Sequence, residues 1–532
     1  MRLVTSEQMR QLDARTIALG TPGLELMERA GMGVVERILA RQAAAVRRGV
    51  LVVAGAGNNG GDGFVIARGL AQHGYRVAVA LLADPEKIGG DAQTNLERWR
   101  RRRGKLLTLA DRPEDLGAAI DGAGVVVDCL LGTGLRREVR GPLGVAIEAI
   151  NRGRDVADVG RRAVVVAVDL PSGLDGDRGE PLGCAVRADL TVTLGAVKLG
   201  LVLPAARAWV GDLELVDIGI GEQAFAEIEP VAEAGDADAS RALLPKREAT
   251  SHKGTHGHLL VVAGSVGKSG AAILAGRAAL RSGAGLVTVA CPEAVRPLVA
   301  GALPELMTDG TGTFSSAEWH ARLEGRKAVV VGPGLGTELA ATRLVRWLVQ
   351  RSEQPLVVDA DGLNALAGSL EVLSRARGGV VLTPHPGEMA RLVGATVGEV
   401  QGDRVAQATS LAKRCGAVVV LKGSGTVIAA PDGRLRINTS GGPILGTGGT
   451  GDVLSGLIGA LLAQGLAPFE AACLGVYLHG LAGDRLARRL GDAGLLASEL
   501  ADEIPLARRE LQEGEPRPLA RAPVRRLPKR SR

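Results

Sequence analysis

The chain has 532 residues, of which 46% are hydrophobic, 23% charged and only 2% aromatic, with a formal net charge of +6. This composition excludes a disordered protein, and the length exceeds the roughly 250 to 300 residues that one hydrophobic core supports. Because aromatic platforms for single-stranded nucleic acid are nearly absent, we expect no nucleic-acid partner.

The cysteines and the N-terminus bear on where the protein works. Five cysteines are scattered without a CxxC pair, which predicts neither a disulfide framework nor a zinc site. The opening sequence MRLVTSEQMRQLDA has no apolar signal region, and no apolar run approaches the roughly 18 residues of a membrane span. We therefore expect a cytoplasmic protein without a membrane partner.

The first half begins with two predicted helices and continues as an alternation of strands and helices. Thr5 and Gln8 form a capping box for the first helix, and Pro22 lies in the first turn of the second. Continuous Val-rich runs are typical of strands buried on both faces. The runs predict a parallel, doubly wound sheet with strands at residues 50–55, 76–82, 124–132 and 163–171.

The pattern fades in an acidic, Ala-rich junction at 221–245 and then restarts. We expect a Rossmann-like three-layer domain at 1–220, a second doubly wound α/β domain at 246–510 and a disordered basic tail at 511–532. Asp432-Gly433 predicts an antiparallel hairpin. The second domain is expected to hold six further strands, at 258–265, 285–291, 328–334, 355–361, 380–386 and 417–424.

The sequence VVAGAGNNGGDGFV places a glycine-rich turn at 58–63, between a strand and a helix predicted at 64–73. Ligands of open α/β sheets bind beyond the carboxyl ends of the strands, and free amides at a helix start favour an anion. The turn lacks the Lys-Ser/Thr of a P-loop and does not match GxGxxG. It therefore predicts a different cradle for a phosphate-bearing ligand, with a purely structural tight turn as the alternative.

Two more strand ends in this half carry polar side chains. Asp128 precedes a second glycine-rich loop, and Asp169 and Ser172 follow another strand. An aspartate at a single strand end is more typical of a helix cap. With the glycine-rich turn at 58–63, however, three polar strand ends would converge in one cleft. Asn59, Asp128 and Ser172 offer hard oxygen ligands suited to an alkali or alkaline-earth cation.

A second glycine-rich loop, GTGGTGD, opens a helix predicted at 453–462. Amides of residues 446–451 can surround phosphoryl oxygens, and Asp452 is placed to take a proton from a hydroxyl; the alternative makes Asp452 a capping residue. KGSGT at 422–426 is a further turn suited to a nucleotide. His385, held between two prolines in TPHPGE, is a candidate for substrate contact.

NNGGDG, VDCLLGTGL and VDLPSGLDGD, in this order, resemble the family of NAD(P)H-hydrate epimerases over roughly residues 1–220. The resemblance implies that Asn59, Asp128 and Ser172 bind potassium and that Asp169 touches the nicotinamide as acid or base. It assigns the hydrated dinucleotide to Asn58, Asn59, Gly60, Gly61 and Asp62, and to Gly132, Thr133, Gly134, Leu135, Arg136, Arg137 and Glu138.

GTGGTGD, KGSGT and SHKGTHGHLLVVAGS resemble the ribokinase-like superfamily, and TPHPGE and GPGLG its ADP-dependent NAD(P)H-hydrate dehydratase branch, over roughly 240–510. The resemblance implies phosphorylation of the C6 hydroxyl followed by elimination, with ADP, Mg²⁺ and Asp452 as base. Ala272 and Gly336 fit the pattern as well as Ala271 and Gly334. The implied nucleotide contacts are Lys422, Gly423, Ser424, Gly425, Thr426 and Gly451; the implied hydrate contacts are Ala271, Gly334, His385 and Asp452.

Together the two halves predict a bifunctional enzyme that repairs hydrated NADH and NADPH. The first would interconvert the R and S hydrates, and the second would dehydrate the S hydrate back to the reduced cofactor. We expect small-molecule substrates and a homo-oligomer. Two alternatives are a small-molecule kinase for a vitamin or sugar fused to a nucleotide-binding scaffold, and a first half that only binds.

Overall fold

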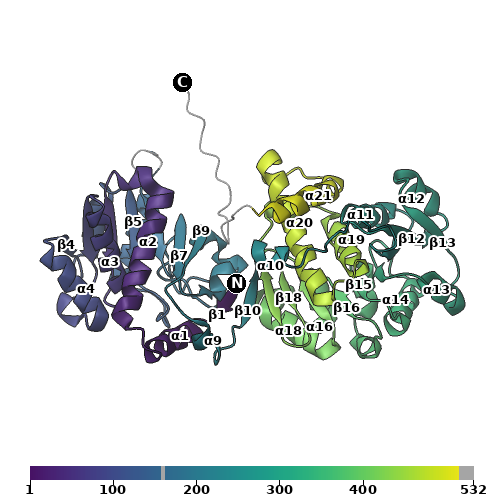
Figure 1. Ribbon diagram of the computed structural model, residues 1–532, viewed down its shortest axis with the longest axis horizontal. Helices are drawn as coiled ribbons and strands as arrows, with labels where there is room; N and C mark the ends of the chain where they lie inside the picture. The colour runs from purple at the N-terminus through teal and green to yellow at the C-terminus, as the bar shows by residue number, and fades with distance from the viewer. Residues whose placement is uncertain (157, 159–161, 515–532) are drawn as a thin grey trace, which may run out of the picture. The chain divides into compact units, whose positions relative to one another are not determined.

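The computed structural model describes residues 1–156, 158 and 162–514. The chain divides into two compact units, one comprising Met1–Glu233 and the other beginning at Ala234. Each unit contains a sheet with helices on both faces (Figure 1). None of the helices in the described ranges has the length and apolar character that a membrane crossing requires.

The first unit contains a parallel sheet of seven strands in the order β4-β3-β2-β5-β6-β7-β9. The chain runs outward from β2 to one edge and then from β5 to the other. The crevice of a doubly wound sheet opens at such a reversal, between β2 and β5. The strands are β2 (Val50–Ala54), β3 (Val77–Leu81), β4 (Lys105–Thr108), β5 (Val125–Cys129), β6 (Val164–Val168), β7 (Leu190–Leu194) and β9 (Asp212–Val216).

Successive side chains of these strands enter two different cores, as the strand period of two requires. Val50 and Val52 pack under one helix layer, while Leu51 and Val53 pack under the other. The first layer is α2 (Gly23–Val46), α3 (Asn58–Gln72) and α4 (Gly90–Arg101), and the second is α5 (Leu116–Ile120) and α6 (Pro142–Arg154). Helix α1 (Ser6–Ala18) has the predicted capping box, in which Thr5 accepts from the Gln8 amide.

A smaller group of elements completes this unit. Strand β1 (Arg2–Val4) pairs in parallel with β8 (Val197–Lys198) and antiparallel with β10 (Ala232–Gly235). Short helices α7 (Leu199–Val202), α8 (Arg207–Val210) and α9 (Glu222–Phe225) lie between these strands in the chain. The segment predicted as a junction thus holds α9, β10 and α10 (Ala237–Arg241).

The sheet of the second unit runs β13-β12-β11-β14-β15-β16-β17-β18-β19, and its chain reverses between β11 and β14. Strands β13 to β17 are parallel, and β17, β18 and β19 are antiparallel neighbours. The predicted hairpin is confirmed as β18 and β19. The strands are β11 (His258–Val262), β12 (Leu286–Pro292), β13 (Met307–Thr311), β14 (Ala328–Val331), β15 (Leu356–Val358), β16 (Val380–Leu382), β17 (Val418–Leu421), β18 (Val427–Ala429) and β19 (Leu435–Asn438).

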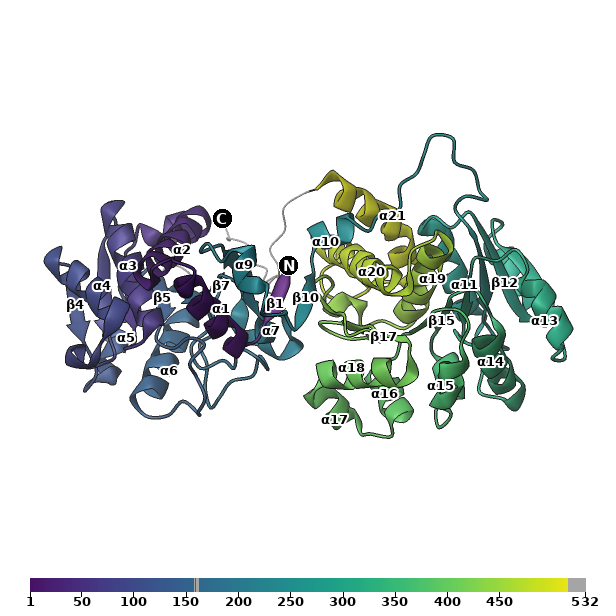
Figure 2. The same cartoon turned by 60° about the horizontal axis from the view of Figure 1, so that its bottom comes forward.

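Figure 2 shows two helix layers around this sheet. One contains α11 (Ser269–Arg281), α19 (Thr450–Ala463), α20 (Pro468–Leu490) and α21 (Ala497–Glu513). The other contains α14 (Leu339–Arg351), α15 (Asp361–Leu366), α16 (Pro386–Val393) and α18 (Arg404–Cys415). The remaining helices are α12 (Arg296–Ala302), α13 (Ser316–Leu323) and α17 (Val397–Gly402).

The doubly wound α/β architecture is confirmed in both units, while several boundaries differ from prediction. Strands β4, β7, β9 and β13 were not predicted, and helices α3 and α19 begin earlier, at Asn58 and Thr450. Glycine disfavours a helix by about 1 kcal/mol relative to alanine, so glycine-rich starts resemble turns in the sequence. Helix α21 extends into the segment predicted as a tail, and residues 515–532 of that segment lie outside the described residues.

Candidate functional site

The glycine-rich segment after β2 is the first turn of helix α3 and not a separate turn. Its first amides have no partners inside the helix, which begins at Asn58. A Cβ at Gly60 would lie 2.0 Å from the carbonyl oxygen of Gly55, and one at Gly61 would lie 2.7 Å from the Met27 side chain. The glycines therefore permit close packing, and they bring a helix N-terminus to the carboxyl edge of the sheet.

The predicted dinucleotide contacts of this segment differ in how deeply they are buried. Asn58 is exposed, whereas Asn59 and Asp62 are 7% and 8% exposed and Gly60 and Gly61 are buried. Burial raises the pKa of Asp62 well above its usual value, and the charges of Asp169 and Asp13 raise it further. A ligand in front of this helix would meet Asn58 and the free amides, while Asp62 faces inward toward other carboxyls.

The three residues predicted to bind a cation lie together. Ser172 donates from its hydroxyl to Asp128 across 2.6 Å and from its amide across 2.8 Å. Asn59 Nδ2 donates to the Leu131 carbonyl at 2.8 Å, and the Leu131 amide donates to Ser172 Oγ at 2.9 Å. The buried Asn59 Oδ1 has no hydrogen-bond partner among the residues that the structure describes. Such an orphaned oxygen beside a buried carboxylate is typical of a cation site.

Asp169 follows β6 in a left-handed backbone conformation, with φ of 66°. Backbone strain of this kind costs about 1 to 3 kcal/mol and gathers at functional sites. Lys198 Nζ, which is completely buried, donates to Asp169 Oδ1 and to the Leu194 carbonyl at 2.9 Å. The Leu194 amide donates to the same Asp169 oxygen at 3.2 Å. Asp169 is thus held as the counter-ion of a buried ammonium group.

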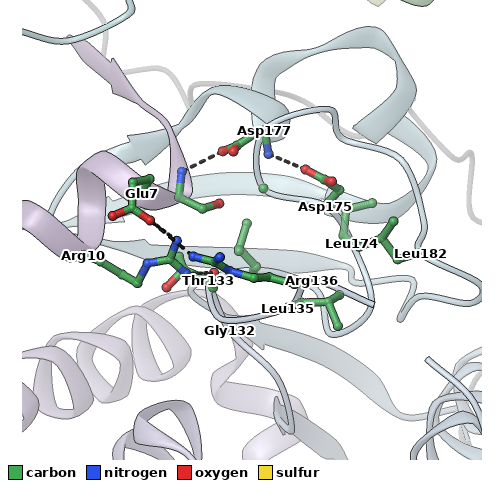
Figure 3. A pocket seen from close by; sticks show the side chains of 13 residues that line it. Glu7, Arg10, Gly132, Thr133, Leu135, Arg136, Leu174, Asp175, Asp177 and Leu182 are labelled. Carbon is green, nitrogen blue, oxygen red and sulfur yellow. Dashed lines mark hydrogen bonds and ion pairs between the residues drawn. The ribbon is translucent and has the colours of Figure 1, made fainter. Parts of the chain in front are cut away.

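A cavity of about 380 Å³ lies beside these residues, between helix α1 and the loop after β5 (Figure 3). Arg10 donates to the Thr133 carbonyl at 3.1 Å, and Glu7 lies between the guanidinium groups of Arg10 and Arg136. The predicted contacts Gly132, Thr133, Leu135 and Arg136 line this cavity, and Gly134, Arg137 and Glu138 are not among its lining residues. Glu138 instead pairs with Arg140.

In the second unit, helix α19 brings Asp452 to its first turn. The N-cap Gly449 is left-handed, with φ of 88°. Of the amides predicted to bind phosphate, that of Gly446 donates to Pro443 at 2.9 Å and that of Thr450 to Thr447 at 3.4 Å, so these two are already engaged.

The environment of Asp452 suits a proton acceptor. Burial raises its pKa to about 6, with Asp359, Asp361 and Glu388 reinforcing the shift and Lys422 opposing it. A carboxyl that titrates near neutral pH can both take and release a proton during turnover.

Lys422 Nζ donates to Asp359 Oδ1 at 2.7 Å and lies 3.8 Å from Glu388. Asp359 is 1% exposed, and its other oxygen accepts from Ser455 on α19 at 2.6 Å. Burial lowers the pKa of Lys422, but the charges of Asp359 and Glu388 outweigh it and the net pKa is raised. A Cβ at Gly451 would lie 3.5 Å from this ammonium, so the positive charge sits beneath the helix start.

His479 of α20 supports the same turn. Its Nε2 lies 2.9 Å from the Thr450 carbonyl, and burial lowers its pKa to about 4. The imidazole is therefore neutral near pH 7 and donates this bond.

The loop predicted to bind the nucleotide follows β17. Gly423 and Ser424 are exposed, while Gly425 and Thr426 are buried. Thr426 Oγ1 donates to the Gly423 carbonyl at 2.8 Å, and Gly423 has φ of 138°, which only glycine adopts readily. The exposed part of this loop is available to a ligand.

His385 is placed by its own helix. Its Nδ1 accepts from the Gly387 amide at 3.0 Å and from the Glu388 amide at 3.3 Å, capping α16. Its Nε2 lies 3.5 Å from Glu388 Oε1, and the side chain is half exposed. The ring edge that carries Nε2 is the part that can meet a substrate.

The structure separates one of the two pairs that the sequence left open. Ala272 is completely buried in the core, whereas Ala271 is half-buried. A Cβ at Gly334 would lie 2.9 Å from the Ala271 side chain, so these two are neighbours. The Gly336 amide is engaged by Asp361 at 2.9 Å. Ala271, Gly334 and Gly336 are all half-buried, so burial excludes only Ala272 from contact with a ligand.

Three residues of these clusters were not predicted, although the sequence held a signal for two. Asp359 follows a Val-rich strand, as Asp128 and Asp169 do. Lys198 interrupts an apolar run, where a charge requires a partner. Ser455, in the middle of a predicted helix, gave no signal.

Comparisons with known proteins cover both units. A family model described as "YjeF-related protein N-terminus" matches residues 23–200, and one described as NAD(P)H-hydrate dehydratase matches 259–506. The chain is 43% identical over 525 residues to the bifunctional NAD(P)H-hydrate repair enzyme Nnr of Moorella thermoacetica, covering 96% of this chain and 98% of the relative. With the enzyme of the same name from Escherichia coli it shares 39% identity, covering 91% and 89%.

Solved structures resemble the second unit. An ADP/ATP-dependent NAD(P)H-hydrate dehydratase from Bacillus subtilis, co-crystallized with ATP/Mg²⁺, is 36% identical. The likeness covers 53% of this chain and 99% of that chain, with a TM-score of 0.48.

Proposed function

The chain belongs to the family of bifunctional NAD(P)H-hydrate repair enzymes, and from that premise we propose which residues carry its two activities. Its first unit is the epimerase domain and its second the dehydratase domain. The observations that support the residue assignment are related in the two units. Asp169 is paired with the buried Lys198, and Asp452 lies within the electrostatic reach of the half-buried Lys422, which is paired with Asp359.

In the epimerase domain, Asp169 is the proton acceptor that works on the hydrated C6 carbon. Its pairing with buried Lys198 keeps one oxygen engaged and fixes the direction of the carboxylate. The free amides at Asn58 and the cavity beside Gly132 to Arg136 take the remainder of the dinucleotide. Exchange of configuration requires a proton acceptor and a proton donor, and a cleft carboxylate supplies the first.

Potassium fits the first unit. The ligands would be Asn59, Asp128 and Ser172. Asn59 Oδ1 is buried without a partner in the described part of the chain, and Asn59 is linked to the Asp128 carboxyl through Leu131 and Ser172. An alkali cation there would supply positive charge close to the loop after β5, which we assign to the substrate. These residues would also hold the loop after β5 in place, since Asn59 and Ser172 both bond to Leu131.

In the dehydratase domain, Asp452 takes the proton from the C6 hydroxyl as it accepts a phosphoryl group. The C6–O bond then breaks and orthophosphate leaves while the ring nitrogen donates electrons. Loss of a proton from C5 forms the C5–C6 double bond, which restores the reduced nicotinamide. ADP would contact 422–426 and Gly451, and Ala271, Gly334 and His385 would contact the hydrate. The buried charge of Lys422 adds positive potential beneath the anion-binding helix start.

Mg²⁺ would arrive with the nucleotide. Among the described residues no group of three His, Cys, Asp or Glu side chains converges to hold a metal. Mg²⁺ commonly binds through phosphates and water with few protein ligands, so we assign its ligands mainly to the nucleotide. A homo-oligomer and a cytoplasmic location stay predictions of the sequence.

The assignment is tested by incubating the protein with both hydrate epimers, with and without ADP. With ADP both epimers should be converted to the reduced cofactor. The absorbance of the restored dihydronicotinamide measures this conversion. Asp452→Asn should stop restoration and leave epimer exchange intact, and Asp169→Asn should restrict restoration to one epimer. A phosphorylated product that accumulates without reduced cofactor would favour the kinase alternative and contradict this proposal.

A further inference from the structure

Helix α1 brings to the epimerase site a carboxyl that has no role in the assignment above. Ser6 and Arg10 of this helix line the cavity beside the loop after β5. Asp13 follows Arg10 by three residues and Ser6 by seven, and residues at these spacings share one helix face. Asp13 therefore continues the cavity-lining face of α1.

Helix α1 also packs beside the strand that carries Lys198. A Cβ at Gly195 would lie 2.8 Å from the Met9 side chain, and Asp13 follows Met9 by one helical turn. Lys198 and Asp169 lie close enough to act on the charge of Asp13, and Asp62 is close enough to act with them. The single ammonium group of Lys198 thus lies near three carboxyl groups, those of Asp13, Asp62 and Asp169, in largely buried surroundings. Leaving two unpaired negative charges there would be costly, so at least one of these carboxyls keeps its proton at neutral pH.

The three carboxyls differ in exposure, and this difference separates their roles. Asp169 is bound to Lys198 and suited to accept a proton. Asp62 is 8% exposed, and burial raises its pKa well above the usual value. Asp13 is half-buried, so it can exchange a proton with solvent. Burial raises the pKa of Asp13 to about 6, with Lys198 opposing and Asp169 reinforcing the shift.

Resting on the epimerase assignment of Asp169 above, we propose that Asp13 is the second proton-transfer group of this site. In the hydrate, C6 carries the hydroxyl and is bonded to the ring nitrogen. Asp169 takes the hydroxyl proton as the C6–N bond breaks and a C6 carbonyl forms, and the nitrogen receives a proton from Asp13. Rotation of the carbonyl group then presents its opposite face to the nitrogen. The nitrogen attacks the carbonyl carbon and returns its proton to Asp13, while Asp169 returns the hydroxyl proton to the oxygen.

The test uses the full chain without ADP, so that dehydration does not proceed, and separates the two epimers by chromatography. Asp13→Asn should lower kcat for epimerisation about 100-fold with KM within about twofold, a typical loss for a general acid. The wild-type rate should decline above about pH 6 as Asp13 loses its proton, and Asp13→Asn should lack this decline. Asp13→Glu should recover part of the rate.

Two controls keep a structural effect apart from a chemical one. Glu25→Gln on α2 removes an exposed carboxylate paired with Arg29 and should leave the rate unchanged. Dehydration of the usable epimer, measured with ADP in the same Asp13→Asn protein, should equal that of the wild type.

The inference is overturned if Asp13→Asn epimerises within twofold of the wild type, or if its pH profile keeps the decline. If Asp13→Asn does not fold, the Glu variant decides: a displaced decline supports the role, and an unmoved one overturns it. A wild-type protein that fails to exchange the epimers would instead contradict the epimerase assignment, which is a separate result.

Discussion

Lys422 donates a hydrogen bond to Asp359 across 2.7 Å, beneath the first turn of helix α19. Asp359 is 1% exposed and its second oxygen is bound by Ser455. The first unit repeats this relationship with Lys198 and Asp169. In each unit a strand-end aspartate is thus fixed by a lysine, fully buried at Lys198 and half-buried at Lys422, which positions charge at the site before any ligand binds.

Removing the lysine of the second unit should be strongly destabilising. Lys422→Met leaves the Asp359 carboxylate buried and uncompensated, which costs about 3 to 5 kcal/mol. Lys268→Met, which breaks the more exposed pair with Asp361, should cost about 0 to 1 kcal/mol. Urea-induced unfolding measures both, and equal effects would show that Asp359 does not depend on Lys422.

Dehydration should depend on the protonation of Asp452. Its pKa is raised to about 6, so the carboxyl is protonated and inactive as a base below that pH and ionised above it. We expect kcat to rise through pH 6 and to level off above about pH 7. The measurement is kcat with saturating ADP between pH 5 and 8.

Glu388 should set part of that pH dependence. Its negative charge raises the pKa of Asp452, so Glu388→Gln should move the rise in kcat to lower pH. Glu371→Gln, an exposed carboxylate in the 3-10 segment Leu370–Arg375, should leave the profile in place. A profile that moves equally in both variants would contradict the assignment of Asp452 as base.

The glycines of helix α3 should differ in their tolerance of alanine. A Cβ at Gly60 would lie 2.0 Å from the Gly55 carbonyl oxygen, while nothing lies within 4 Å of one at Gly57. Gly60→Ala should therefore destabilise the first unit by about 1 to 3 kcal/mol or more, and Gly57→Ala should be close to neutral. Thermal unfolding and the rate of epimer exchange measure the difference.

Potassium should stabilise the first unit more than sodium does. A cation held at 100 times its Kd raises stability by about 2.7 kcal/mol. Asn59→Leu should remove the difference between the two salts, since it deletes the unpartnered oxygen. Asn151→Leu breaks satisfied bonds to Ala185 and Arg187 in the same unit and should lower Tm equally in both salts. A potassium effect that persists in Asn59→Leu would exclude this site.

Local sequence patterns predicted much of the fold because each acts over a few residues. The Val-rich runs located most strands of both sheets, and Asp432-Gly433 located the hairpin. Strand β13, Met307–Thr311, was missed because it lies at the sheet edge and has no buried apolar run. The start of α3 was also misplaced, since Gly60 and Gly61 pack closely against Gly55 and Met27, which are contacts that the local sequence pattern does not show.

The sequence by itself determined the two doubly wound units, the family, the strand ends that carry Asp128 and Asp169, and the helix start that carries Asp452, because these follow from periodicity and from short motifs. Only the tertiary structure decided which side chains meet. Asp13 reaches the neighbourhood of Lys198, and Asp359 is locked between Lys422 and Ser455, across large separations in the chain. Such contacts between distant residues depend on the order of the strands and on which face of each helix is turned toward the sheet. The charges that these contacts bury set the pKa values on which the chemistry depends.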